Sequence, residues 1–172
     1  MAEQINSNQA TGNNGNRSIQ IVVFKLGHEE YGIQIDQIKE VVITPNITRM
    51  PQTQSFVKGV ANIRGNVIAI FDLEERFNLE RTSNQAGNKY TLVVESEDFK
   101  MGLLVNDVPN TVSVSAANLD ESVSIINDVH TESNYIKGII KHDKRLIILI
   151  DIFKVIDQEM TSTIKKAAAV AA

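Results

Sequence analysis

Short runs of branched apolar residues, separated by polar turns, recur along most of the chain. The first run, residues 19–26 (IQIVVFKL), is followed by a polar turn and by a run in which Ile33 and Ile35 alternate with polar positions. Alternation with a period of two predicts β-strands that bury one face. Two later runs, residues 67–71 (VIAIF) and 146–150 (LIILI), contain no polar position. Unbroken apolar runs of this length predict strands that are covered on both faces.

Turn and cap residues mark where these strands begin and end. Arg64 and Gly65 separate residues 59–63 (GVANI) from the run VIAIF, which predicts a tight hairpin turn with a positive φ at Gly65. Asp72 and Asp151 follow the two unbroken runs and precede short segments that predict helices. A carboxylate at this position is typical of a helix N-cap.

The chain contains two similar halves. Residues 56–77 match residues 135–156 at an offset of 79, which aligns Asp72 with Asp151. Residues 30–42 match residues 100–112 at an offset of 70, which aligns Gly32 with Gly102. The nine extra residues of the second half fall in residues 113–134, which we interpret as a longer loop. The order of matched segments predicts an internal repeat.

Two repeats of short strands predict an all-β fold made of two small, five-stranded β-barrels packed side by side, with short helices. We expect a disordered tail over residues 1–18, because Asn, Gln, Ser and Gly dominate it. A single two-barrel domain then spans residues 19–158, with barrel one at about 19–80, a linker at 80–89 and barrel two at about 89–158. Residues 159–172 are predicted to be a C-terminal tail, either a frayed helix or a loose segment, that is dispensable for stability.

Composition supports this fold and excludes several functions. The chain has 22 Ile and 17 Val but only 9 Leu, and branched side chains favour strands. A net charge of −4 and 5% aromatic residues argue against nucleic-acid binding. The absence of Cys excludes disulfides and thiolate catalysis. We expect a cytoplasmic protein, because the sequence shows neither a signal peptide nor an apolar run long enough for a membrane span.

Catalytic and cofactor motifs are missing from the sequence. It contains no phosphate-binding glycine loop and no nucleophile elbow, and its three histidines lack metal-ligand spacing. We therefore expect no cofactor and no metal. One enzymatic alternative is a small β-barrel hydrolase that uses Asp72 and Asp151 as a carboxylate pair. The basic segment at residues 137–145 is interpreted as a solvent-exposed hairpin tip, with an anionic partner site as the alternative.

Five segments in the first half resemble the CheW family of bacterial chemotaxis coupling proteins. They are residues 30–35 (EYGIQI), 38–41 (IKEV), 47–51 (ITRMP), 56–65 (FVKGVANIRG) and 70–73 (IFDL). Residues 135–151 in the second half are also similar to the family, and the resemblance runs from about residue 19 to about residue 160. It implies two Src-homology-3-like barrels side by side and no catalytic activity.

The resemblance also implies partners and a binding site. The protein would be an adaptor that couples the cytoplasmic tips of methyl-accepting chemotaxis receptors to the regulatory domain of a CheA-type histidine kinase. It would reach the membrane only through receptor arrays, without direct lipid contact. By motif position, the receptor-facing residues would be Ile38, Glu40, Val41, Asn62, Arg64 and Gly65, with Val108 as the second-half counterpart of Ile38. An adaptor of a non-flagellar chemosensory pathway is the alternative within the same family.

Overall fold

Eleven strands and a few short helices make up the described part of the chain, which in this computed structural model comprises residues 17–81, 89–122 and 135–170. The strands are β1 (Ser18–Leu26), β2 (Glu29–Gln34), β3 (Ile38–Ile43), β4 (Val57–Ile63), β5 (Asn66–Asp72), β6 (Tyr90–Glu95), β7 (Lys100–Val105), β8 (Asn110–Ser115), β9 (Leu119–Asp120), β10 (Ile136–His142) and β11 (Arg145–Ile150). The α-helices are α1 (Leu73–Arg76), α2 (Ile152–Val155) and α3 (Gln158–Val170), and the 3-10 turns are η2 (Ile35–Gln37) and η3 (Ala116–Asn118).

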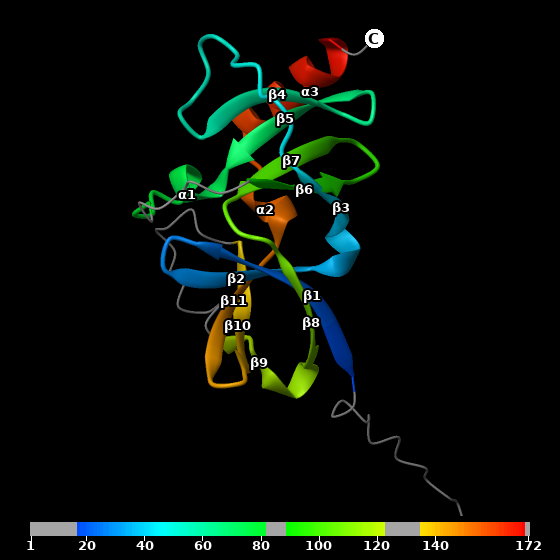
Figure 1. Cartoon of the computed structure of the whole chain (residues 1–172). Helices are drawn as coiled ribbons and strands as arrows, with labels where there is room; N and C mark the ends of the chain where they lie inside the picture. Colours follow the sequence, from blue (N-terminus) through cyan, green and yellow to red (C-terminus); the bar gives the residue numbers. More distant parts are fainter. Residues whose placement is uncertain (1–16, 82–88, 123–134, 171–172) are drawn as a thin grey trace, which may run out of the picture.

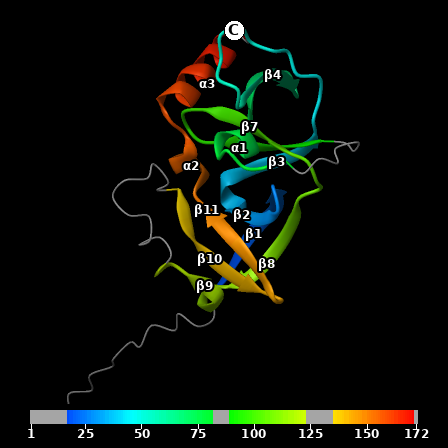
Figure 2. The ribbon, with the colours of Figure 1, turned by 90° about the vertical axis from the view of Figure 1, so that its left-hand side faces the viewer.

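The strands form two curled, barrel-like sheets that stack on each other (Figures 1 and 2). One sheet has the order β3-β6-β7-β5-β4, and we call it the upper barrel from its place in Figure 1. The other, the lower barrel, has the order β8-β1-β2-β11-β10-β9. This arrangement confirms the prediction of an all-β fold with two small barrels side by side, although the lower sheet has six strands and only the upper sheet has the five predicted.

The division of the strands between the barrels differs from the sequence-based prediction. We expected residues 19–80 to form one barrel and residues 89–158 the other, but β1 and β2 pair with β8 and β11 in the lower barrel. The physical reason lies in η2, which carries the chain directly from β2 into the upper barrel. Strand β2 pairs in parallel with β11. Because parallel neighbours need a long connection, the partner of β2 comes from the second half of the chain and not from the next strand. The two barrels are therefore built from interleaved halves.

The internal repeat is confirmed by the strand registers. Val23 lies opposite Gly32 in the pair β1–β2, and Val93 lies opposite Gly102 in β6–β7, at the predicted offset of 70. In the parallel pairs, Leu149 lies opposite Gly32 and Ile70 lies opposite Gly102. Ile70 and Leu149 are therefore equivalent at the predicted offset of 79. Each hairpin of one repeat thus completes the barrel that the other repeat provides. The two repeats exchange equivalent hairpins within one chain.

Glycine occupies two of these equivalent positions, where side chains of the parallel neighbour approach the backbone closely. A Cβ at Gly102 would lie 2.6 Å from Ile70 Cδ1, and a Cβ at Gly32 would lie 3.1 Å from Ile147 Cγ2. Both contacts join a hairpin of one repeat to a strand of the other. The close approach of the two repeats therefore depends on these positions.

Apolar residues form three cores that explain the unbroken apolar runs. On β5, Ile68 and Ile70 point into the upper barrel, whereas Ala69 and Phe71 join a core shared between the barrels. Strand β11 repeats the arrangement, because Ile147 and Leu149 fill the lower barrel and Ile150 reaches the shared core. The prediction that these strands are covered on both faces is confirmed for β5 and for β11 from Ile147 onward, whereas Leu146 at the start of the second run is exposed.

The C-terminal segment is part of the fold, contrary to the prediction of a dispensable tail. Residues 158–170 form α3, which packs along β5 on the outside of the upper barrel (Figure 2). Met160, Ile164 and Ala167 are buried in the shared core, at 0%, 4% and 1% exposure. Ala167 is the buried alanine of the helix, whereas Ala168 and Ala169 are exposed.

Two predicted boundaries lie mostly outside the described residues. The predicted N-terminal tail falls on residues 1–16, apart from Arg17 and Ser18, and Ser18 already pairs with Ser115 in the β1–β8 ladder. The predicted linker falls on residues 82–88, between Arg81 and Lys89.

Removing buried volume from α3 tests its contribution to stability. Ile164→Ala deletes most of a buried side chain, and such changes cost about 2–5 kcal/mol of unfolding free energy. Urea denaturation should show this loss, whereas Ser162→Ala, an exposed position on the same helix, should lie within about 0.5 kcal/mol of the unmodified protein. Equal stabilities for the two variants would show that the packing of α3 contributes little to the stability of the fold.

Candidate functional site

The turn between β4 and β5 holds its central residues in a rigid, left-handed conformation. Arg64 has a φ of 52° and Gly65 a φ of 85°, the pattern of the tight turns that match the twist of a hairpin. The Gly65 N–H donates to Asn62 Oδ1 at 2.9 Å, which fixes the turn from inside. The positive φ predicted for Gly65 is confirmed. Three of the predicted site residues therefore form one structural unit.

An ion pair joins this turn to strand β3. Arg64 Nε donates to Glu40 Oε2 at 2.6 Å, and the Arg64 side chain is 74% exposed against 23% for Glu40. Strands β3 and β4 are the two outer strands of the upper sheet, so the ion pair spans the gap that remains when the sheet curls. A backbone bridge between Thr48 and Val60 closes the same gap. The structure thus brings together two residues that are far apart in sequence.

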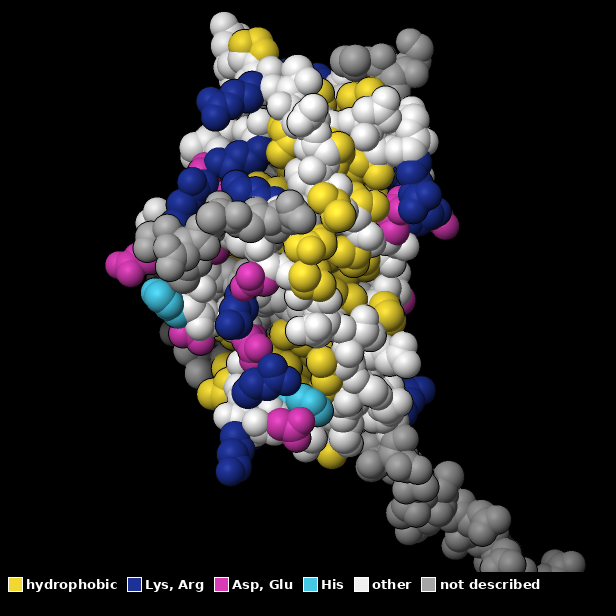
Figure 3. Space-filling model, viewed as in Figure 1, with side chains coloured by type: hydrophobic (Ala, Val, Ile, Leu, Met, Phe, Trp, Pro, Cys, Tyr) yellow, Lys and Arg dark blue, Asp and Glu magenta, His cyan; other side chains and the backbone are white. Residues whose placement is uncertain are grey.

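Exposed apolar side chains accompany the ion pair on β3. Val41 is 43% and Ile43 64% exposed, and Ile35 of η2 is 38% exposed. Hydrophobic side chains gather over β3 and the junction of the barrels in Figure 3. Ile38 is partly buried and packs against the shared core instead. Sequence reasoning missed Ile35 and Ile43. For Ile43, the alternation of exposed positions Lys39, Val41 and Ile43 along an outer strand was a usable signal.

The charge of Lys39, the remaining outward residue of β3, is matched within the chain. Its Nζ lies 2.9 Å from Glu95 Oε2. This hydrogen-bonded pair raises the pKa of Lys39 and lowers the pKa of Glu95. Both groups therefore stay charged at neutral pH. Of the two cations Lys39 and Arg64, Arg64 is the more exposed and therefore the more available to a partner.

Val108 lies apart from the other predicted site residues. It follows β7, and the nearby Asn106 donates to Glu74 Oε2 on α1 at 3.2 Å. Strands β5 and β7 run parallel, so Val108 lies beyond their ends, whereas Arg64 lies before the start of β5. The side chain of Val108 is exposed. The structure therefore joins Glu40 to the turn residues Asn62, Arg64 and Gly65 through the ion pair, places Ile38 and Val41 on the same strand as Glu40, and leaves Val108 outside. We call these six residues, together with Ile35 and Ile43, the β3–turn surface.

The two aspartates of the hydrolase alternative serve as helix caps. Asp72 Oδ1 accepts from Glu74 N at 2.9 Å, and Asp151 Oδ1 accepts from Phe153 N at 3.1 Å. Each carboxylate also has a side-chain partner, because Arg81 donates to Asp72 Oδ2 at 3.0 Å and Gln37 donates to Asp151 Oδ1 at 3.2 Å. One aspartate ends β5 of the upper barrel and the other follows β11 of the lower barrel. The cap prediction is confirmed, and both carboxylates have hydrogen-bond partners within the chain.

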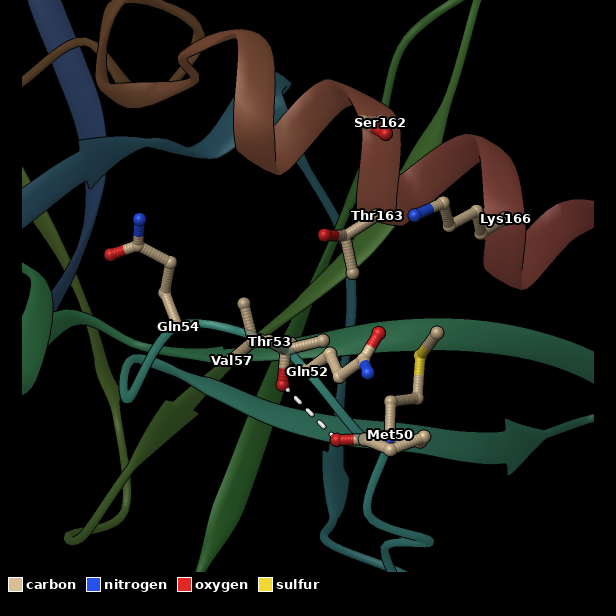
Figure 4. A pocket seen from close by; sticks show the side chains of 9 residues that line it. Met50, Gln52, Thr53, Gln54, Val57, Ser162, Thr163 and Lys166 are labelled. Carbon is tan, nitrogen blue, oxygen red and sulfur yellow. Dashed lines mark hydrogen bonds between the residues drawn. The ribbon is translucent and has the colours of Figure 1, made fainter.

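A cavity of about 540 Å³ lies between α3 and the loop before β4 (Figure 4). Thr53 Oγ1 donates to the Met50 carbonyl at 3.2 Å on its loop side, and Lys166 is its one charged lining residue. The lining contains no Asp, Glu or His, so it offers no acid–base pair. Across residues 17–81, 89–122 and 135–170, no group of three His, Asp or Glu side chains is placed to hold a metal ion.

Rigid strands that present exposed apolar residues and an ion pair define a protein-binding module. Searches for similar proteins identify its family. Residues 20–160 match the model of the CheW-like domain. The chain is 30% identical to chemotaxis protein CheW of Treponema pallidum, over 78% of this chain and 80% of the relative, and 30% identical to CheW of Klebsiella aerogenes, over 87% and 88%.

A known structure gives the same result. The crystal structure of the scaffolding protein TtCheW from Thermoanaerobacter tengcongensis superimposes with a TM-score of 0.71 at 28% identity, covering 84% of this chain and 96% of the other. The chain therefore belongs to the CheW-like domain family, as its motifs suggested. It is a non-catalytic chemotaxis adaptor. Of the helices in its described part, none is long and apolar enough to cross a membrane.

The turn offers a clean test of backbone strain. A Cβ at Gly65 would meet no atom within 4 Å, so a substitution there is limited only by the positive φ. Gly65→Val should cost about 1–2 kcal/mol, because a branched residue disfavours this conformation, whereas Gly65→Asn should be close to neutral. Thermal melting distinguishes the two variants. An equal loss for both would mean that contacts of the turn, and not its φ, set the stability.

Proposed function

We propose that the chain couples chemotaxis receptors to a CheA-type histidine kinase, with the β3–turn surface facing the receptor. The pairing of Arg64 with Glu40 beside the exposed Val41 is the observation that carries this assignment. An apolar strip with an adjacent directed cation suits the side of an amphipathic helix, which offers apolar residues and polar groups at regular spacing. The cytoplasmic tip of a chemoreceptor is the helical partner that the family resemblance implies.

The fold supports a role for Arg64 in binding. The guanidinium is fixed at Nε by Glu40, so its remaining N–H groups have a defined direction in the free protein. The hairpin that holds it is anchored by buried residues on β4 and β5, including Ile63 and Ile68. A partner therefore meets a preorganised donor, which lowers the ordering cost of binding.

A separate surface is assigned to the kinase. The family resemblance implies that the regulatory domain of the kinase shares the two-barrel fold, so barrel-to-barrel packing like that inside this chain is the simplest contact. Leu146, near the tip of the β10–β11 hairpin, is 59% exposed and provides an apolar contact at the end of the lower barrel. We place the protein in the cytoplasm, joined to membrane receptor arrays through these partners.

Truncating Arg64 should weaken receptor binding without unfolding the protein. An arginine with directed contacts at the centre of an interface contributes about 2 kcal/mol, so Arg64→Ala should lower affinity for a receptor cytoplasmic fragment roughly thirty-fold. Its unfolding free energy should fall by less than about 1 kcal/mol, because the ion pair is exposed. Calorimetric titration and thermal melting measure the two effects.

The conservative variant Arg64→Lys separates geometry from charge. Lysine keeps the charge but loses the planar set of donors, so affinity should still fall clearly. Lys144→Ala, in the equivalent turn of the β10–β11 hairpin, is the matched control and should bind the receptor normally. Normal binding by Arg64→Ala, or a melting temperature as low as that of Gly65→Val, would show that Arg64 is structural and that the assignment is wrong.

Kinase binding should respond weakly to salt. Screening acts on exposed charges and leaves apolar contacts largely unchanged. Affinity for the kinase regulatory domain, measured by calorimetry, should therefore change only a few-fold between about 0.1 M and 1 M salt. A hundred-fold loss would instead indicate an electrostatic contact, with the basic residues at 137–145 as the first candidates.

A further inference from the structure

The two repeats are joined by the same contacts that would join two separate chains. We define the first repeat as residues 17–81 and the second as residues 89–170. The hairpin β1–β2 of the first repeat sits between β8 and β11 of the second, and β6–β7 of the second sits between β3 and β5 of the first. The offset of 70 that relates the hairpins also relates β3 to β8, because Leu92 lies opposite Val41 and Val22 opposite Thr111. We call the site that each hairpin fills, between β8 and β11 or between β3 and β5, its socket. The two sockets are therefore equivalent positions of the repeat.

We propose that each socket accepts the hairpin of a second copy of this chain, which produces a closed dimer with exchanged repeats. In such a dimer, the first repeat of one copy pairs with the second repeat of the other, and the reverse pairing completes a second two-barrel unit. Every strand pair and every contact of the shared core is retained, because each either lies within one repeat or joins one first repeat to one second repeat. The β3–turn surface also stays whole, since Glu40 and Arg64 both belong to the first repeat.

Only the connection between the repeats distinguishes the two forms. A short connection gives the repeats of one chain an effective concentration in the millimolar range, so the monomer prevails at micromolar concentration. Refolding at high concentration favours exchange between chains. Once formed, the dimer should persist on dilution, because its release requires opening the shared core. A dimeric adaptor would carry two β3–turn surfaces.

Two glycines allow a complementation test, because each lies against backbone of its own repeat. A Cβ at Gly59 would lie 2.1 Å from the Thr48 carbonyl oxygen, and a Cβ at Gly138 would lie 2.7 Å from the Asp120 carbonyl oxygen. Gly59→Val therefore damages the first repeat and Gly138→Val the second. A dimer of one chain of each kind contains one undamaged unit, made from the sound first repeat of one chain and the sound second repeat of the other.

The test co-refolds the two full-length variants from denaturant and measures mass by light scattering and unfolding by circular dichroism. We expect the mixture to give a dimer with a cooperative transition of about half the wild-type amplitude, while each variant alone gives none. A mixture of Gly138→Val with Gly102→Val is the matched control, because both lesions lie in the second repeat and no undamaged unit can form.

A second measurement uses the unmodified protein. Refolding at about 1 mM, followed by dilution, should leave a dimer fraction at least ten-fold larger than refolding at about 1 μM. A monomer at both concentrations would overturn the proposal, as would equal recovery in the complementing mixture and in the control. Neither readout uses a receptor or kinase, so the result is independent of the proposed function.

Discussion

Burial of both faces of the central strands is the constraint on which the rest of the structure depends. Strands β1, β5 and β11 have no continuous polar face, so one layer of covering side chains cannot satisfy them. Each fills its own barrel with one face and the shared core with the other, as Ile70 and Phe71 do on β5. The shared core holds the barrels together. Because each barrel contains a hairpin of the other repeat, the barrels cannot separate without breaking strand pairs in both.

Much of this fold could be predicted from the sequence, because its signals are local. The positive φ at Gly65 and the caps at Asp72 and Asp151 follow from patterns within a few residues. The offsets of 70 and 79 follow from comparing short segments of the two repeats. The membership of β1 and β2 could not be predicted, because both sockets accept the same apolar pattern. The packing of α3 was also missed, since the burial of a small residue such as Ala167 is not revealed by composition.

The candidate site was predictable as a set of residues but not as a geometry. Motif similarity identified Glu40 and Arg64, yet their ion pair depends on how the upper sheet curls to bring its outer strands together. Buried Glu74 shows the same limit. It accepts from Gly27 N at 2.9 Å and from Asn106 Nδ2 at 3.2 Å, which ties α1 to both barrels. In the sequence it resembles any glutamate in the first turn of a helix.

The central claim is that a rigid turn and an outer strand of the upper barrel form the receptor-facing surface. Titration of the isotope-labelled protein with a receptor cytoplasmic fragment, followed by amide NMR shifts, tests it most directly. The account predicts shift changes concentrated in η2, β3 and the turn at Arg64 and Gly65, with the β10–β11 hairpin unchanged. Shift changes centred on the β10–β11 hairpin or on α3, with the turn silent, would contradict it.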